Sequence, residues 1–364
     1  MAKIKALVRG VWHPAIEETP ELDAEFARHR GRFRHAVTRD GSSGFPAKAG
    51  RYCLYVSYAC PWAHRAILYR RLKGLDHVIA MSVLHPRWGG PDGWSFGDTD
   101  MSTVDFAGGR RHLHEVYRAA APDFSGRVTV PVLWDELTRT IVSNESADII
   151  RMLNSAFDGI GGDPAVDFYP EDLQDEIDRL NAFLLPEVCR AVYRVGFARS
   201  QAAHDRAVEA LFQALDTLGR RLEDGRPYLL GDRVTESDWH LFTCLCRFDA
   251  AYHGALRCSL RRLIDDPNLA AYARRLHRLP GVAETVRIDQ IKRHYHDDLP
   301  EIDRTIVPAG PSRDYRGDDP TRDAAAQQQE RSTSDVRHPF EILGQQGDGR
   351  TIHGSPQRLA KTRL

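Results

Sequence analysis

The sequence predicts two domains, an α/β domain followed by an all-helical domain. The first is indicated by an apolar, strand-like run at 51–57, which is followed by a helical pattern and then by a second apolar run at 78–84. The second is indicated by helical spacing of apolar residues from Glu171 to about Ile291. A chain of 364 residues is long enough to give each domain a core of its own.

The composition is that of an ordinary soluble globular protein, with 42% hydrophobic residues, 28% charged residues and a formal net charge of −1. Without a basic excess, nucleic acid is not an expected partner. No apolar run approaches the roughly 18 residues that span a bilayer, and the N-terminus lacks a signal-peptide core, so no membrane partner is expected. The six cysteines show neither disulfide-framework nor zinc spacing. We therefore expect reduced thiols, a cytoplasmic location and no bound metal.

Residues 1–48 are interpreted as a polar, irregular N-terminal extension, and the α/β domain is expected over 49–155. Arg51–Ser57 has the β-branched and aromatic content of a strand. A helix over 62–73 follows, with Gly74 as its C-cap. The strand Val78–Leu84 then completes a β-α-β unit, which requires parallel pairing of the two strands.

The remainder of the α/β domain supplies a hairpin and another helix. Residues 85–110, rich in Gly, Pro, Trp and Asp, are predicted to form a long loop near a site, and a short helix follows at about 110–121. Val128–Asp135 and Thr140–Val142 form an antiparallel hairpin, and a helix covers 145–153. A β-α-β unit followed by a β-β-α unit is the order of a thioredoxin-like domain. Pro131 falls where that fold has a cis-proline, although an edge-strand proline is the alternative.

The all-helical domain is expected over 170–311. Its predicted helices cover 171–184, 187–196, 201–223, 236–248, 267–278 and 281–291. Thr235 and Asp238 fit a capping box, which indicates a role in folding rather than in catalysis. Residues 315–364 are dominated by Arg, Asp, Gln, Gly and Ser and are predicted to be a disordered tail.

Cys60 is the candidate nucleophile, because it follows the first strand and precedes a helix that begins at Pro61. Backbone N–H groups and the helix dipole at such an N-terminus favour a thiolate. Ala63 occupies the position where a dithiol redox motif has its second cysteine. A mixed disulfide on Cys60 would therefore be resolved by an outside thiol, with glutathione as the obvious candidate. The alternative is a structural cysteine buried at a strand–helix turn.

A thioredoxin-like domain followed by an all-helical domain is the layout of cytosolic glutathione transferases. Over roughly residues 32–311 the chain resembles the glutathionyl-hydroquinone reductases, the cysteine-dependent Xi class of that superfamily. The segments that carry the resemblance are 55–65 (YVSYACPWAHR), 93–96 (GWSF), 126–135 (GRVTVPVLWD), 144–146 (NES), 193–198 (YRVGFA), 235–242 (TESDWHLF), 247–252 (RFDAAY) and 306–311 (IVPAGP).

This resemblance implies the reaction of a glutathionyl-hydroquinone with glutathione to give hydroquinone and glutathione disulfide. Glutathione is then a co-substrate, and no permanently bound cofactor is expected. The matching positions imply glutathione contacts from Trp94, Arg127, the Val130 backbone, Glu145 and Ser146. For Trp94 and Arg127 the alternatives are loop packing and surface charge, and for Glu145 and Ser146 plain N-capping, which is compatible with ligand contact.

The resemblance also implies an aromatic pocket. Tyr193 and Tyr295 match positions that line the hydroquinone pocket and are the catalytic candidates beside Cys60, while Tyr252 is a further candidate for binding the ring. A tyrosine that only fills the core is the alternative for each. A homodimer is the expectation for the family.

Two other functions remain open at this stage. One is a general thioltransferase or dehydroascorbate reductase similar to the omega class, which also uses a cysteine. The Trp94 loop, the pair Tyr193 and Tyr295, and the 306–311 segment favour the quinone-directed reaction over this one. The other is a non-catalytic interaction module, which we would expect to have lost Cys60 or its glutathione-binding residues.

Overall fold

The computed structural model describes residues 3–299, 313–314 and 317–318. Its central sheet has the strand order β4-β3-β5-β6, with bounds β3 (Tyr52–Val56), β4 (Ala80–Val83), β5 (Val132–Asp135) and β6 (Thr140–Ser143). β3 pairs parallel with β4 and antiparallel with β5, and every residue of β3 is buried. A strand buried on both faces needs a layer on each side of the sheet.

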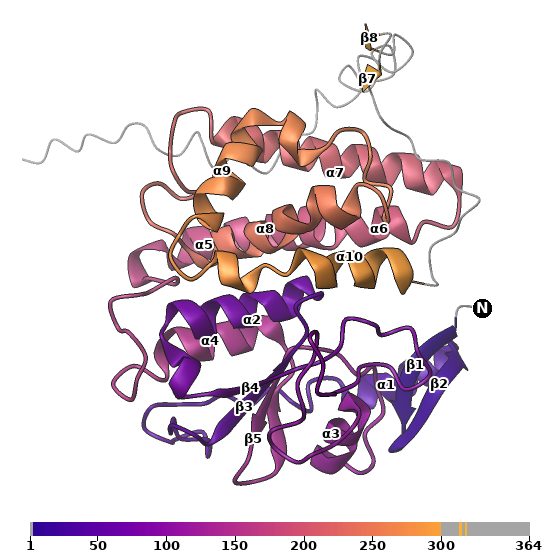
Figure 1. Cartoon of the computed structure of the whole chain (residues 1–364), viewed down its shortest axis with the longest axis vertical. Coiled ribbons are helices and arrows are strands. Elements are labelled where there is room, and N and C mark those ends of the chain that lie inside the picture. Colours follow the sequence, from indigo (N-terminus) through magenta and orange to yellow (C-terminus); the bar gives the residue numbers. More distant parts are fainter. Residues whose placement is uncertain (1–2, 300–312, 315–316, 319–364) are drawn as a thin grey trace, which may run out of the picture. The chain divides into compact units, whose positions relative to one another are not determined.

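Helices provide both layers. α2 (Pro61–Leu72) and α4 (Ser146–Ser155) lie between the sheet and the helical domain, and α3 (Leu113–Ala120) covers the opposite face (Figure 1). The bond between Val130 and Pro131 is cis, as predicted. The thioredoxin-like fold of this domain is thereby confirmed, and the long loop between β4 and α3 lies where the sequence indicated it.

The interpretation of residues 1–48 as irregular is wrong. They contain a hairpin, β1 (Lys3–Val8) and β2 (Val11–Glu17), followed by α1 (Pro20–His29). The hairpin turns at Arg9 and Gly10, both with positive φ (48° and 76°), the conformation that two-residue hairpin loops favour. Leu7 and Gly126 exchange backbone hydrogen bonds of 3.0 and 2.9 Å, so the hairpin is attached to the α/β domain.

The second domain is helical, as predicted. Its α-helices are α5 (Gln174–Leu184), α6 (Ala191–Gly196), α7 (Gln201–Arg221), α8 (Glu236–Arg247), α9 (Pro267–His277) and α10 (Ile288–Asp297). Short 3₁₀ turns of this domain occur at Glu171–Leu173, Leu263–Asp265 and Ala283–Thr285, and another, Leu75–His77, lies between α2 and β4 in the α/β domain. No helix in the described ranges is long and apolar enough to cross a membrane.

Two predicted helices differ in detail. The segment 187–196 is divided into a π-helical turn, Leu185–Cys189, and α6. The segment 281–291 is interrupted at Arg287, whose φ and ψ of −110° and 84° are not helical, so the last helix runs from Ile288 to Asp297 and contains Tyr295. A second π-helical turn, Phe248–Tyr252, extends α8. π-helical turns are often found at functional sites.

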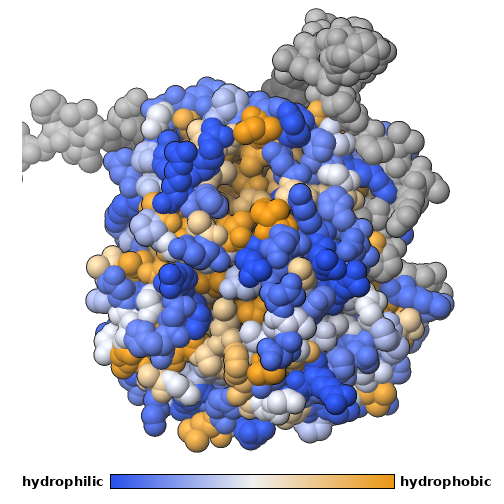
Figure 2. Space-filling view, in the orientation of Figure 1, coloured by the Kyte–Doolittle hydropathy of each residue, from blue (hydrophilic) through white to orange (hydrophobic). Residues whose placement is uncertain are grey.

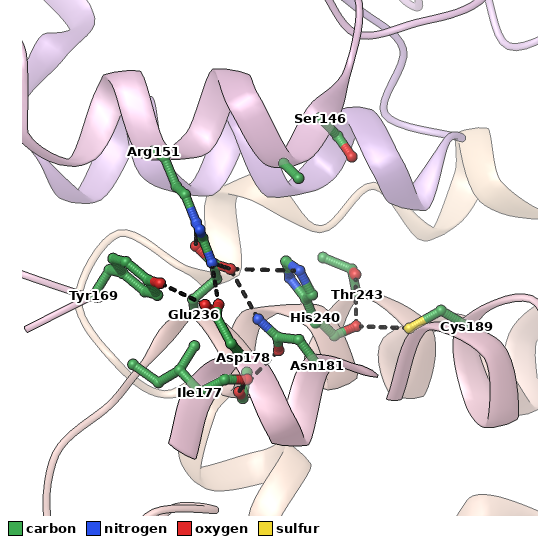
Figure 3. A network of polar contacts seen from close by, with 12 residues as sticks. Ser146, Arg151, Tyr169, Ile177, Asp178, Asn181, Cys189, Glu236, His240 and Thr243 are labelled. Atoms are coloured by element: carbon green, nitrogen blue, oxygen red, sulfur yellow. Dashed lines mark hydrogen bonds and ion pairs between the residues drawn. The ribbon is translucent and has the colours of Figure 1, made fainter. Parts of the chain in front are cut away.

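A buried polar network joins the two domains (Figure 3). Glu236 of α8 accepts hydrogen bonds from Arg151 of α4, at 3.1 and 3.2 Å, and from Asn181 of α5, at 2.8 Å. Arg151 also pairs with Asp178. Hydrophilic side chains cover most of the face seen in Figure 2, with apolar residues exposed in a hollow over the helical domain and in smaller patches over the α/β domain.

The tail prediction for 315–364 lies outside the described residues, apart from Gly317–Asp318. These two residues form β8, which pairs with β7 (Arg313–Asp314). The 306–311 segment of the resemblance also lies outside the described residues.

Candidate active site

Cys60 is the N-cap residue of α2, which begins at Pro61. Proline suits this position because the first helical N–H has no partner within the helix. The Cys60 side chain is half-buried, and its thiol donates to the Val130 carbonyl at an Sγ–O distance of 3.7 Å. The carbonyl that precedes the cis-proline therefore faces the thiol, across the gap between α2 and β5.

The backbone amides at the helix N-terminus act on the Cys60 thiol as predicted, but burial of the sulfur opposes them. Burial raises the pKa of the Cys60 thiol, and this effect outweighs the opposing ones. The backbone N–H groups of Ala63 and Trp62 and the guanidinium groups of Arg247 and Arg65 each lower that pKa. The amides act as the sequence indicated, but loss of water around the sulfur costs the anion more than they return.

Three tyrosines from separate elements lie together beside this thiol. Tyr193 of α6 and Tyr295 of α10 share a hydrogen bond of 2.6 Å between their hydroxyls. The ring of Tyr252, from the π-helical turn, meets Tyr295 edge-on at 5.2 Å between centroids and lies 6.3 Å from Tyr193. A negative charge on Cys60 would raise the pKa of both Tyr193 and Tyr295, which places the cluster within electrostatic reach of the sulfur.

The three hydroxyls differ in acidity. Burial raises the pKa of Tyr193 and of Tyr252 well above the usual value, but that of Tyr295 only to about 12. For Tyr295, nearby Arg247 and the hydrogen bond with Tyr193 oppose the effect of burial. Tyr295 is thus the hydroxyl whose pKa both Arg247 and the hydrogen bond with Tyr193 lower.

Arg127 and Glu145 line one pocket of about 290 Å³, together with Phe26 of α1 and Arg34, which follows that helix. Arg127 is half-exposed and forms an ion pair with Glu18, at the end of the N-terminal hairpin. Glu145 is exposed and is the N-cap of α4, where its carboxylate accepts from the Ala147 N–H at 3.4 Å. An anion near these first-turn amides would be stabilised by the helix dipole.

Ser146 is the first residue of α4 and is buried; its hydroxyl donates to Glu145 at 3.4 Å. Trp94 is buried in the loop between β4 and α3. Its ring stacks on His294 of α10, with centroids 5.6 Å apart. The structure therefore brings Cys60 together with Val130 and with the tyrosines, and Arg127 together with Glu145, and it packs Trp94 against the last helix.

Arg247 is a residue of this site that the sequence reasoning missed. It is the last residue of α8 and is completely buried. Its guanidinium donates to the carbonyls of Tyr58 and Ala59, at 2.8 and 3.1 Å, directly ahead of Cys60. No sequence signal marked it, because an arginine in the last turn of a helix is ordinarily a solvated residue that complements the helix dipole.

Comparison with known proteins identifies the family of the chain. A model of the glutathione S-transferase N-terminal domain matches residues 59–156, and one of the C-terminal domain matches residues 201–275. A glutathionyl-hydroquinone reductase of Sphingobium chlorophenolicum is 42% identical over 312 residues, which is 85% of this chain and 97% of that protein. Another, from Escherichia coli, is 44% identical over 316 residues, which is 85% of this chain and 95% of that protein. The chain belongs to the glutathionyl-hydroquinone reductases, the Xi class of glutathione transferases.

Solved structures of the class show the same fold. A Xi-class glutathione transferase from Natrialba magadii is 42% identical, with a TM-score of 0.77 over 85% of this chain and 95% of that one. A glutathione-bound transferase homologue from E. coli, also 42% identical, has a TM-score of 0.74 over 85% and 96%. The protein is therefore a Xi-class enzyme of the glutathione transferase superfamily.

Proposed function

We propose that this enzyme reduces glutathionyl-hydroquinones with glutathione, through a mixed disulfide on Cys60. The observation that carries the proposal is that one thiol contacts the carbonyl before the cis-proline, which suits a peptide thiol, and lies within electrostatic reach of a cluster of tyrosines, which suits a phenolic ring. Membership of the family supports the same reaction.

In the first step the Cys60 thiolate attacks the sulfur of the glutathionyl group. A bond forms between the two sulfurs while the bond from sulfur to the aromatic carbon breaks, and that carbon takes up a proton. The product is the hydroquinone, and glutathione remains on Cys60 as a mixed disulfide. Departure of the ring is easier from a keto tautomer, in which charge develops on the ring oxygen.

Tyr295 is the residue best suited to stabilise that oxygen or to transfer the proton, because Arg247 and the hydrogen bond with Tyr193 both lower the pKa of its hydroxyl. Tyr193 supports it through their 2.6 Å hydrogen bond. Tyr252, whose ring packs edge-on against Tyr295, would contact the aromatic ring of the substrate.

In the second step another glutathione attacks the mixed disulfide, which releases glutathione disulfide and restores Cys60. For the peptide, Arg127 would pair with a carboxylate, and the Val130 backbone would pair with its amides. Glu145 would bind the γ-glutamyl ammonium. Ser146 and the first amides of α4 would bind the neighbouring carboxylate. Trp94 would cover the peptide from the loop side.

The test is incubation with glutathionyl-menadiol and glutathione, followed by measurement of hydroquinone release. We expect turnover by the wild type and none by Cys60→Ala. Cys258→Ala, which removes a thiol buried elsewhere in the helical domain, is the control and should retain turnover. An inactive wild type, or full activity of Cys60→Ala, would contradict the proposal.

A relative from Schizosaccharomyces pombe, 40% identical over 304 residues, is an omega-like glutathione S-transferase. Omega-like thioltransfer is accordingly the second candidate. Parallel assays with dehydroascorbate and with a small mixed disulfide separate the two functions: preference for these substrates over glutathionyl-menadiol would favour the second.

A further inference from the structure

The guanidinium of Arg247 is enclosed by the site and has no carboxylate among its hydrogen-bond partners in the described part of the chain. Besides the Tyr58 and Ala59 carbonyls, it donates to the Thr243 carbonyl at 2.7 Å, to His64 Nδ1 at 3.0 Å and to Cys246 Sγ at 3.3 Å. A buried cation ordinarily has an anionic partner, because burial without one is costly. Its acidic neighbours here are Cys246, Tyr252, Tyr295 and Cys60, and the last three are groups of the candidate site.

The hydrogen bonds fix the protonation of His64. Because an arginine can only donate, His64 Nδ1 must accept, so the ring proton is on Nε2. That N–H donates to the Thr285 hydroxyl at 2.8 Å, which in turn donates to the Val282 carbonyl at 2.6 Å. Burial and Arg247 both lower the pKa of His64, which keeps it neutral. The chain of bonds therefore anchors Arg247 to α2, the helix that carries Cys60.

We propose that Arg247 is the positioning residue of this site: it fixes the loop ahead of Cys60 through two carbonyls, and its charge stabilises both the attacking thiolate and the anionic oxygen that develops beside Tyr295. The single positive charge of Arg247 can stabilise both anions, because the negative charge passes from the sulfur to the leaving ring within the first step. The role in leaving-group stabilisation depends on the proposed function, whereas the role toward the Cys60 thiolate does not.

The experiment measures alkylation of Cys60 by iodoacetamide between pH 6 and pH 10, followed at the Cys60 peptide by mass spectrometry. Only the thiolate reacts, so the pH midpoint reports how well the protein stabilises that anion. In Arg247→Met we expect the midpoint to rise by about one pH unit and the rate at pH 7.5 to fall about tenfold. Arg247→Lys keeps the charge but not the planar fork, so its midpoint should stay near that of the wild type while kcat falls.

Arg151→Met is the matched control, since it removes an arginine from the same domain junction without touching the Cys60 loop. An unchanged midpoint in folded Arg247→Met, or an equal shift in Arg151→Met, would overturn the proposal. If Arg247→Met does not fold, the Arg247→Lys comparison decides: a midpoint raised by one pH unit or more in Arg247→Lys, although the positive charge is kept, would overturn it. An inactive wild type would refute the proposed function, yet the alkylation profiles would still test Arg247.

Discussion

At the scale of single residues, the hydroxyls of Tyr193 and Tyr295 are not equivalent, although they are hydrogen-bonded to each other. The pKa of Tyr295 is raised to about 12, whereas that of Tyr193 is raised well above its usual value. Arg247 lowers the pKa of Tyr295 but is not among the groups that shift Tyr193 most. The more acidic hydroxyl is the better proton donor to a developing ring oxygen.

We therefore predict that Tyr295→Phe lowers kcat by about 10²–10³-fold, the range for loss of a general acid. Tyr193→Phe removes only a supporting hydrogen bond, worth about 1 kcal/mol, and should lower kcat by about fivefold. Steady-state kinetics with glutathionyl-menadiol measures both. Equal losses in the two variants, or a larger one in Tyr193→Phe, would reverse the assignment.

The residues of this site could be predicted to different extents for physical reasons. Cys60 and Pro131 could be predicted because their positions follow from local order along the chain, a strand followed by a helix start and a proline before a strand. The net direction of the pKa shift of Cys60 could not be predicted, since it depends on burial in the folded protein. Arg247 was missed for the same reason, because the Tyr58 and Ala59 carbonyls to which it donates lie more than 180 positions away in the sequence.

At the scale of elements, local signals predicted most helices and the sheet, and the N-terminal hairpin was the main failure. Its signals were present, with alternating apolar residues at 3–8, a Gly at the turn, and Thr19 capping a helix that begins at Pro20. Pro14 within β2 and the polar composition concealed them. The hairpin is also an edge element, half-exposed along much of its length, so it lacks the continuous apolar run of a central strand such as β3.

Arg151 of α4 is linked to α8 through the buried carboxylate of Glu236 (Figure 3). Arg151→Met leaves that carboxylate with Asn181 as its remaining strong donor, so we predict a loss of about 1–3 kcal/mol in the free energy of unfolding. Urea denaturation followed by circular dichroism measures it. In the double variant Arg151→Met, Glu236→Gln the loss should be partly recovered, because the neutral amide is cheaper to bury. A loss in the double variant equal to the sum of the losses in the two single variants would contradict this account.

At the scale of the whole molecule, two distant parts of the chain hold the loop that carries Trp94. The N-terminal hairpin holds it through Lys5, which donates to the Trp88 carbonyl at 2.9 Å, and through the Trp12 indole, which donates to the Pro91 carbonyl at 3.0 Å. α10 holds it through His294, which hydrogen-bonds the Pro86 carbonyl at 2.9 Å. The extension thus belongs to the framework of the proposed glutathione site.

We predict that Trp12→Ala raises KM for glutathione severalfold with a smaller change in kcat, because it loosens the shelter over the peptide but leaves Cys60 and the tyrosines in place. Steady-state kinetics at varied glutathione concentration provides the measurement. Val11→Ala is the control, since Val11 is the exposed neighbour of Trp12 in the same strand. A fall in kcat alone, or an equal effect of Val11→Ala, would contradict a role for the hairpin in glutathione binding.

The stability of the whole molecule should fall as the pH drops from 7 to 5. Burial lowers the pKa values of His64, His240 and His294 in the folded protein, those of His64 and His240 well below 6.5. Below about pH 6.5 these histidines bind protons in the unfolded chain but stay neutral in the folded chain, so the free energy of unfolding decreases with falling pH. Each histidine that stays neutral contributes about 1.4 kcal/mol per pH unit in this range.

His240→Gln isolates one such contribution. The drop in unfolding free energy between pH 7 and pH 5 should be smaller in this variant than in the wild type by about 2 kcal/mol, since one proton-binding group is lost from the unfolded chain. Urea titrations at both pH values measure the difference, with His77→Gln, at an exposed position, as the control. An identical pH dependence in wild type and His240→Gln would contradict this account, because it would mean that the folded protein accommodates the imidazolium of His240 despite its burial.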